Sequence, residues 1–172
     1  MTDLPPSIGI IGGTGKLGMG LAARWSRAGI DILLGSRDAA KSAAAAAVLK
    51  AATNGVVHGL TNREAAAQAA LVVLTVPFSV HGEVLREIRP AVTGKIVVDT
   101  TVPLLPPAIT SVHLPPEGSA ARQARLILGS DVRVVSTLHT VAAARLKGTA
   151  QQLDSDVLVF GDDATARERP LP

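Results

Sequence analysis

An α/β fold with a mainly parallel sheet, covered by helices on both faces, is the fold class that this sequence predicts. Short runs rich in Val, Ile and Leu alternate with alanine-rich helical stretches along the chain. Runs such as Leu71–Leu74 are apolar at every position, as a sheet buried on both faces requires. A glycine-rich turn joins the first apolar run to the first helical stretch. These observations predict a doubly wound arrangement with right-handed crossovers.

The first part of the chain alternates strands and helices regularly. Leu17, Leu21 and Trp25 share one helical face, so Trp25 is predicted to lie in the core. Asp38 and Asn62 stand where helices begin and are predicted N-caps. The predicted strands are residues 7–11, 30–34, 56–58, 71–76 and 95–100, and the predicted helices are residues 17–28, 39–52, 62–70 and 80–88.

The later part of the chain is less regular. Residues 101–118 contain five prolines and no clear period, which predicts a long loop of functional or mobile character. Helices are predicted at residues 119–128 and 141–146, and strands at residues 132–135 and 157–160. Asp162 and Asp163 are interpreted as turn and cap residues. The length of 172 residues suits a single domain covering residues 1–172.

Composition narrows the classes of function. Apolar residues make up 47% of the chain, enough for a substantial core, and cysteine is absent, which fits a reducing compartment. The net charge of +3 is scattered and aromatic residues amount to 2%, which gives no support for nucleic-acid binding. The N-terminus is not a signal peptide, and apolar runs fall short of a membrane span. We therefore expect a cytoplasmic protein.

The glycine-rich turn matches GxGxxG at Gly13, Gly15 and Gly18, between a predicted strand and a predicted helix. Gly13 would permit the tight turn, Gly15 the close approach of a pyrophosphate, and Gly18 the packing of the helix on the sheet. The N-terminus of the helix would present N–H groups to the phosphates. The motif in this context predicts a Rossmann-type dinucleotide-binding unit.

Other readings of the same glycines are weaker. A P-loop would need glycine where Ile10 stands and a hydroxyl where Leu17 stands, so that interpretation is rejected. Gly12, Gly15 and Gly18 also fit GxxGxxG, a pattern of atypical short-chain dehydrogenases, but their usual catalytic tyrosine is absent because the chain has no tyrosine. A non-catalytic NADP(H)-sensing protein of that type stays open.

The end of the second predicted strand indicates which dinucleotide binds. An NAD site places a carboxylate there for the ribose 2′-hydroxyl, whereas this strand ends in Gly35-Ser36-Arg37 and reaches its first carboxylate at Asp38. Arg37 and Lys41 lie about one helical turn apart and can face one point. A hydroxyl, a guanidinium and an ammonium suit a 2′-phosphate, so the sequence predicts a preference for NADP(H).

The histidines and carboxylates give little direct evidence of chemistry. His139 follows a predicted strand at the ligand-binding edge, where it could adjoin a cofactor or bond to structure. His81 is interpreted as a surface capping residue, and His58 and His113 as ordinary. No spacing of histidines or carboxylates predicts a metal site, and no catalytic acid or base is assigned.

Several motifs in order resemble the F420-dependent NADP oxidoreductases, which transfer hydride between NADP(H) and the deazaflavin coenzyme F420. They are Gly12-Gly13-Thr14-Gly15-Lys16-Leu17-Gly18, Gly35-Ser36-Arg37, Leu74-Thr75-Val76-Pro77, Leu138-His139-Thr140-Val141-Ala142-Ala143-Ala144-Arg145 and Gly161-Asp162-Asp163. The resemblance implies that the pyrophosphate is held by Thr14, Gly15, Lys16 and Leu17, and the 2′-phosphate by Ser36, Arg37 and Lys41. It also implies that the adenosine and ribose lie along Val76, Pro77 and Phe78, and that the nicotinamide lies near Val141 and Ala142. Val102-Pro103-Leu104 would border the deazaflavin.

The resemblance also implies a homodimer and further family segments beyond Asp163 that complete the deazaflavin pocket. On that basis NADP(H) binding is expected here, with deazaflavin binding weak unless a second chain covers the site. Such hydride transfer needs no acid or base, since both cofactors carry their own reactivity. The alternatives are a non-catalytic NADP(H)-binding protein and, less favoured, an oxidoreductase acting on a small imine, enol or alcohol.

Overall fold

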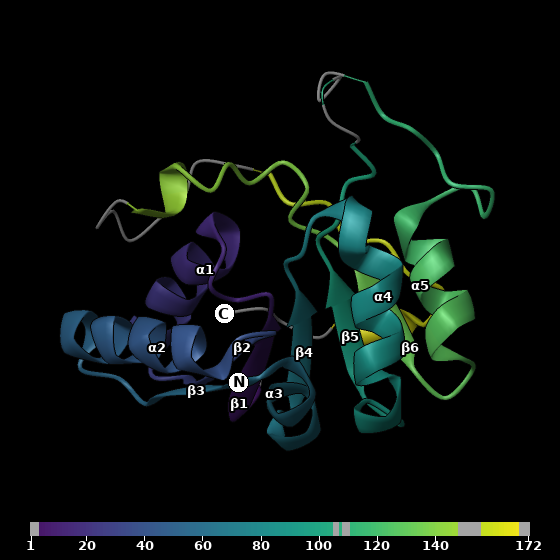
Figure 1. The fold of residues 1–172 in the computed structure, drawn as a ribbon. Helices are drawn as coiled ribbons and strands as arrows, with labels where there is room; N and C mark the ends of the chain where they lie inside the picture. The colour runs from purple at the N-terminus through teal and green to yellow at the C-terminus, as the bar shows by residue number, and fades with distance from the viewer. Residues whose placement is uncertain (1–3, 105–106, 108–110, 148–155, 169–172) are drawn as a thin grey trace.

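The structure is a computed structural model that describes residues 4–104, 107, 111–147 and 156–168. Its core element is a parallel sheet in the order β3-β2-β1-β4-β5-β6, which confirms the predicted Rossmann-type arrangement (Figure 1). Apolar runs without alternation form the central strands because both faces of the sheet are covered. The strands are β1 Ser7–Ile11, β2 Asp31–Ser36, β3 Val57–Thr61, β4 Leu71–Leu74, β5 Ile96–Asp99 and β6 Arg133–Ser136.

Helices cover both faces of the sheet and create two apolar cores. One core contains Leu21 and Trp25, which confirms the interior position predicted for Trp25, and the other contains Leu85 and Ile88. The helices are α1 Lys16–Arg27, α2 Ala39–Thr53, α3 Asn62–Gln68, α4 Phe78–Ile88, α5 Ala120–Leu128 and α6 Ala164–Arg167, with 3-10 turns η1 Arg89–Ala91 and η2 Arg145–Lys147.

Two predictions for the later part of the chain were wrong. Residues 157–160 form no strand: Phe160 makes an isolated antiparallel bridge with Ser136, and the four side chains are 41–62% exposed. An inner strand of a parallel sheet is covered on both faces, and these exposed side chains are not covered in that way. The helix predicted at residues 141–146 is only a short 3-10 turn that begins at Arg145.

The helix caps were predicted in part. Asp38 caps α2 by accepting a hydrogen bond from Lys41 N at 3.1 Å, as expected. Asn62 is not the cap of α3, because Thr61 forms a capping box with Glu64. The side chain of Asn62 is instead directed to the glycine loop.

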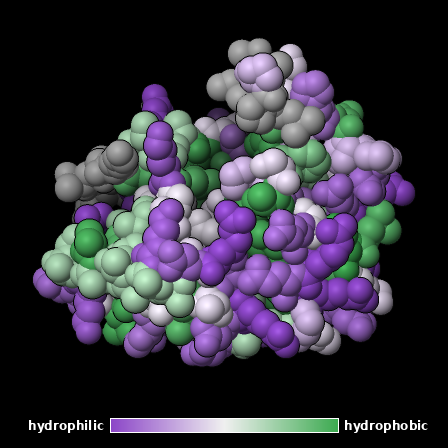
Figure 2. Space-filling view, viewed as in Figure 1, coloured by the Kyte–Doolittle hydropathy of each residue, from purple (hydrophilic) through white to green (hydrophobic). Residues whose placement is uncertain are grey.

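The surface over α2 is unusually apolar. Figure 2 shows this left-hand side in pale green, where many alanines are exposed and Val48 is 65% exposed. In the part of the chain that the structure describes, no helix is long and apolar enough to cross a membrane.

Candidate functional site

The glycine loop follows β1 and is fixed by neighbours on both sides. Gly12 has a φ of 70°, a conformation that favours glycine, so Gly12 makes the turn that was predicted for Gly13. Gly13 N donates to Gly35 O at 2.9 Å, and a Cβ on Gly13 would lie 2.5 Å from Leu34 Cδ1. Gly13 therefore serves close packing against β2 rather than the turn itself.

Gly15 and Gly18 differ sharply in their surroundings. A Cβ on Gly18 would lie 2.6 Å from Gly13 Cα, so glycine allows α1 to pack against the loop, whereas close packing against the sheet was predicted. At Gly15, apart from the adjoining residues of the chain, the nearest described atom to such a Cβ is Gly12 O, at 3.4 Å. Gly15 is the N-cap of α1, and neither a capping side chain nor an acidic residue occupies the first turn in the described structure. This helix terminus is suited to an anion.

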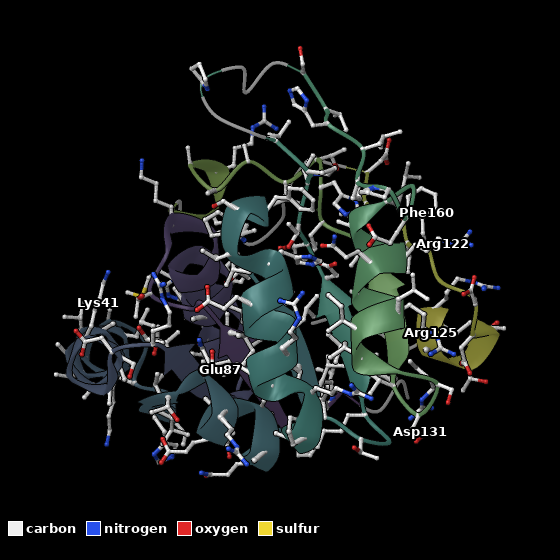
Figure 3. The ribbon with its side chains drawn as sticks, turned by 45° about the vertical axis from the view of Figure 1, so that its right-hand side comes forward. Lys41, Glu87, Arg122, Arg125, Asp131 and Phe160 are labelled. Carbon is white, nitrogen blue, oxygen red and sulfur yellow. The ribbon has the colours of Figure 1, made fainter. Side chains whose placement is uncertain are left out.

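The carboxyl end of β2 presents cations beside the loop. Ser36 is buried, and its Oγ accepts from Asp38 N at 3.2 Å. Arg37 and Lys41 are both exposed, and Figure 3 shows Lys41 at the outer side of α2. The carboxylate of Asp38 is directed to the backbone of α2, which leaves the guanidinium and the ammonium as the charged groups suited to a phosphate.

The connection from β4 to α4 lies against the same loop. A Cβ on Gly12 would meet Val76 Cγ1 at 2.5 Å, so Val76 borders the turn directly. Thr75 fixes this connection because both its N and its Oγ1 donate to Ile11 O at 2.9 Å. Pro77 is exposed and Phe78 half-buried at the start of α4. The structure therefore places Val76 next to the glycine loop, and residues 77 and 78 lead from it into α4.

Asn62 is a residue of this site that the sequence reasoning missed. Its Oδ1 accepts from Gly12 N at 3.1 Å, and its Nδ2 donates to Glu87 Oε2 at 3.4 Å. The second contact orients the amide, so that the oxygen faces the loop. Figure 3 labels Glu87 on α4. An asparagine directly after a strand, at the edge where ligands bind, was the available signal.

The segment after β6 carries the remaining predicted residues. Leu138 has a φ of 64°, an uncommon conformation for a branched residue, and it redirects the chain at this edge. His139 is exposed, and its Nε2 lies 3.0 Å from Ser136 Oγ. Val141 packs against the core of β1 and α1, whereas Ala142 is exposed. This segment lies at the carboxyl end of the sheet.

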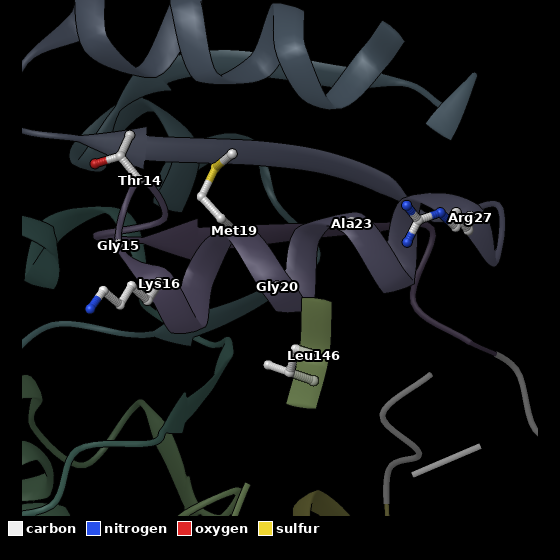
Figure 4. A pocket seen from close by; sticks show the side chains of 8 residues that line it. All are labelled: Thr14, Gly15, Lys16, Met19, Gly20, Ala23, Arg27 and Leu146. Atoms are coloured by element: carbon white, nitrogen blue, oxygen red, sulfur yellow. The ribbon is translucent and has the colours of Figure 1, made fainter. Parts of the chain in front are cut away.

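A pocket of about 350 Å³ runs along α1 from the glycine loop (Figure 4). Thr14, Gly15 and Lys16 line one end, and Arg27 lines the other. Three residues predicted to hold the pyrophosphate thus line the pocket, whereas the residues predicted for the 2′-phosphate and the adenosine, at positions 36, 37, 41 and 76–78, do not.

Residues 102–104 follow β5 and pair with a later part of the same long segment. Leu104 forms an antiparallel bridge with Val112, and His113 N donates to Pro103 O at 2.9 Å. These contacts shape the segment near the carboxyl edge. Among the described residues no group of three or more His, Asp or Glu side chains could hold a metal ion.

His81 was wrongly interpreted as a surface residue. It is fully buried, and its Nε2 lies 2.9 Å from Oδ2 of Asp99, which is also fully buried. Its Nδ1 lies 3.0 Å from Gln123 Oε1. Burial opposes the charged imidazole, but the hydrogen bond and charge of Asp99, with Gln123, outweigh it and raise the pKa of His81 above its usual value.

This raised pKa makes stability depend on pH. The contribution of protonated His81 is fully present below the unfolded pKa of about 6.5 and is lost as pH rises through the higher folded value. We expect the free energy of unfolding of the unmutated chain, relative to His81→Gln, to be largest near pH 6 and to shrink in more alkaline buffer. Urea unfolding at several pH values measures it. A difference that grows with pH would contradict the protonated assignment.

Comparison with known proteins adds independent evidence. The family described as "NADP oxidoreductase coenzyme F420-dependent" matches residues 7–103. An F420-dependent NADP reductase of Methanothermobacter thermautotrophicus is 39% identical over 94% of this chain and 72% of its own length. The enzyme of the same name from Methanocaldococcus jannaschii is 33% identical over 94% of this chain and 75% of its own length.

Solved structures agree with these matches. A crystal structure of a candidate F420-dependent NADP reductase from Arthrobacter has a TM-score of 0.76 and 25% identity, covering 95% of this chain and 76% of its own. Pyrroline carboxylate reductase of Plasmodium falciparum, solved with NADP bound, shares the fold alone, at a TM-score of 0.61 and 16% identity over 97% of this chain and 52% of its own. The chain therefore belongs to the F420-dependent NADP oxidoreductase family.

Proposed function

We propose that this chain transfers a hydride between NADP(H) and the deazaflavin coenzyme F420 at the carboxyl edge of its sheet. The observation that carries the proposal is the 39% identity with a curated F420-dependent NADP reductase over 94% of the chain, which includes the glycine loop and the residues after β2. The open space at Gly15 and the uncapped start of α1 fit the pyrophosphate of a dinucleotide.

Cofactor binding is assigned to residues that the fold brings to one edge. Gly13, Thr14, Gly15, Lys16, Leu17 and Gly18 would form the pyrophosphate loop. Ser36, Arg37 and Lys41 would hold the 2′-phosphate, and Val76, Pro77 and Phe78 would lie along the adenosine and ribose. His139, Val141 and Ala142 would line the nicotinamide side. The exposure of Arg37 and Lys41 beside the loop supports the assignment, since a 2′-phosphate needs accessible cations.

The chemistry needs positioning more than side-chain catalysis. The nicotinamide and the deazaflavin supply the hydride donor and acceptor between them. The chain's own task is to hold both rings in one geometry and to exclude water. Residues 102–104, tied to residues 112 and 113, would form the wall on the deazaflavin side.

A steady-state assay tests this function. The unmutated chain is mixed with F420 and either NADPH or NADH, and F420 reduction is followed by its absorbance. We expect turnover with NADPH and much slower turnover with NADH. A small imine as acceptor in place of F420 serves as the comparison. Absence of turnover with F420, or preference for the imine, would overturn the proposal.

Asn62 provides a second prediction. Asn62→Ala leaves Gly12 N–H without its acceptor, which is expected to destabilise the fold by about 1–3 kcal/mol and to weaken NADP(H) binding about fivefold. Gln68→Ala removes an exposed amide from the same helix and should change neither quantity. Calorimetry and thermal unfolding measure both. Equal behaviour of the two variants would show that Asn62 does not hold the loop.

A homodimer and a cytoplasmic location, both expected above, are included in the proposal. The dimer rests on the family resemblance, and the location on the lack of cysteine in the sequence. Light scattering coupled to gel filtration tests the dimer, and a monomeric mass at assay concentration would contradict it.

A further inference from the structure

The buried His81 connects three elements of the fold. It lies on α4, its Nε2 is 2.9 Å from Asp99 at the end of β5, and its Nδ1 is 3.0 Å from Gln123 on α5. Nothing in the proposed hydride transfer uses this imidazole. A fully buried polar side chain with both nitrogens engaged has a role in organising its surroundings.

The orientation of Gln123 determines the state of the ring. Gln123 Nε2 donates to Glu117 Oε2 at 3.3 Å, so its Oε1 must be the atom that faces His81. Reversing the amide would place its oxygen against the carboxylate. Both ring nitrogens therefore face acceptors, and both must donate. His81 is an imidazolium paired with the carboxylate of Asp99.

The hydrogen-bonded series of side chains that runs from Asp99 through His81 and Gln123 to Glu117 contacts both ends of one segment. Asp99 Oδ1 accepts from Thr101 N at 3.0 Å, at the start of the segment that follows β5. Glu117, at the other side of the ring, lies just before α5 and closes the same segment. His81 thus ties the entry and the exit of residues 101–118 to a single buried charge.

We propose that His81 is a positioning residue for the described ends of this segment, residues 101–104 and 111–118, and hence for the deazaflavin-side wall that residues 102–104 would form. This inference rests on the proposed function. The glycine loop is held by different contacts, from Gly35 and Asn62. Loss of the His81 contacts should therefore weaken F420 binding more than NADP(H) binding. Thr101 Oγ1 also reaches Val76 O, at 3.4 Å, so a small effect on NADP(H) is expected.

The variants are His81→Gln, Gln123→Ala and Glu117→Gln, with His58→Gln as the matched control. His58 is an exposed histidine on β3 and has no part in the site. Gln123 and Glu117 are only half-buried, so their variants should fold even if His81→Gln does not. We expect His81→Gln and Gln123→Ala to raise the KM for F420 about tenfold, while the Kd for NADP+ changes less than about threefold. The control should change neither constant.

Two readouts do not depend on turnover. Hydrogen exchange at the Thr101 amide should become faster in His81→Gln and Gln123→Ala, because the acceptor Asp99 is no longer fixed. In nitrogen NMR, His81 of the unmutated chain should be doubly protonated at neutral pH. Its charged contacts are Asp99 from β5 and, through Gln123 of α5, Glu117, so Glu117→Gln should make it lose its proton at lower pH.

The outcomes separate this inference from the proposed function. Equal changes in F420 and NADP+ binding, an unchanged Thr101 amide, or a neutral His81 at pH 7 would each overturn the positioning role. Absence of turnover in the unmutated chain would overturn the proposed function instead. The exchange and NMR measurements would still decide whether His81 holds the segment.

Discussion

A Gly15→Val variant is expected to fold normally and to lose dinucleotide binding, with affinity for NADP(H) reduced at least about a hundredfold. The structure leaves room for a side chain at Gly15, because beyond the adjoining residues the nearest described atom to a Cβ is Gly12 O, at 3.4 Å. The same space would be needed by the pyrophosphate. Calorimetry with NADPH and thermal unfolding measure the two properties separately.

Two other glycines serve as controls for Gly15→Val. Gly82→Val adds the same branch on α4, where a Cβ would make only ordinary contacts beginning at 3.6 Å, and should keep both fold and binding. Gly18→Val would place Cβ 2.6 Å from Gly13 Cα and should damage the fold itself. Retained binding in Gly15→Val would mean that the loop is structural only.

Arg37→Ala is expected to abolish most of the preference for NADP(H) over NAD(H). Removing one charge-assisted contact to the 2′-phosphate costs about 1.5–3 kcal/mol, or roughly 10- to 150-fold in affinity for NADP(H) alone. Binding of NAD(H), which lacks that phosphate, should hardly change. Arg63→Ala removes another exposed arginine, from α3, and is the matched control. Equal affinities of the unmutated chain for both dinucleotides would refute the assignment.

The fold was predictable because its signals are local and mutually consistent. The predicted strand at residues 7–11 coincides with β1, and the cap at Asp38 is present as expected. When short apolar runs alternate with helices at this spacing, the pattern indicates strands of a parallel sheet that is buried on both faces. The run at residues 157–160 misled because an apolar sequence does not reveal how far a segment pairs with its neighbour, and here Phe160 alone makes a bridge, to Ser136 at the end of β6. Figure 3 shows Phe160, which is 55% exposed, on this segment.

The parts of the site that depend on contacts between distant residues were missed. Asn62 reaches Gly12 across 50 positions of sequence, so its place after a strand could indicate the ligand-binding edge but not this particular partner. His81 could have been found, since it shares a helical face with the buried residues Val84, Leu85 and Ile88. Asp99 likewise ends an apolar strand, where a carboxylate needs a partner. Taken together, these two observations would have predicted the buried ion pair of His81 and Asp99.

The position of β1 between β2 and β4 has a consequence for how the chain folds. Thr75 and Ile11, which join the ends of β4 and β1, are 64 positions apart. Pairing of β1 with β4 therefore requires the long stretch of chain between them to become ordered. Parallel pairing over such separations is intrinsically slow, because the entropy of closing the loop must be overcome before the contacts form. Because Val76 borders Gly12 from the β4 side, this side of the glycine loop is absent until β1 and β4 have paired. A folding intermediate with β1 and β2 already paired would therefore still be unable to retain its nucleotide.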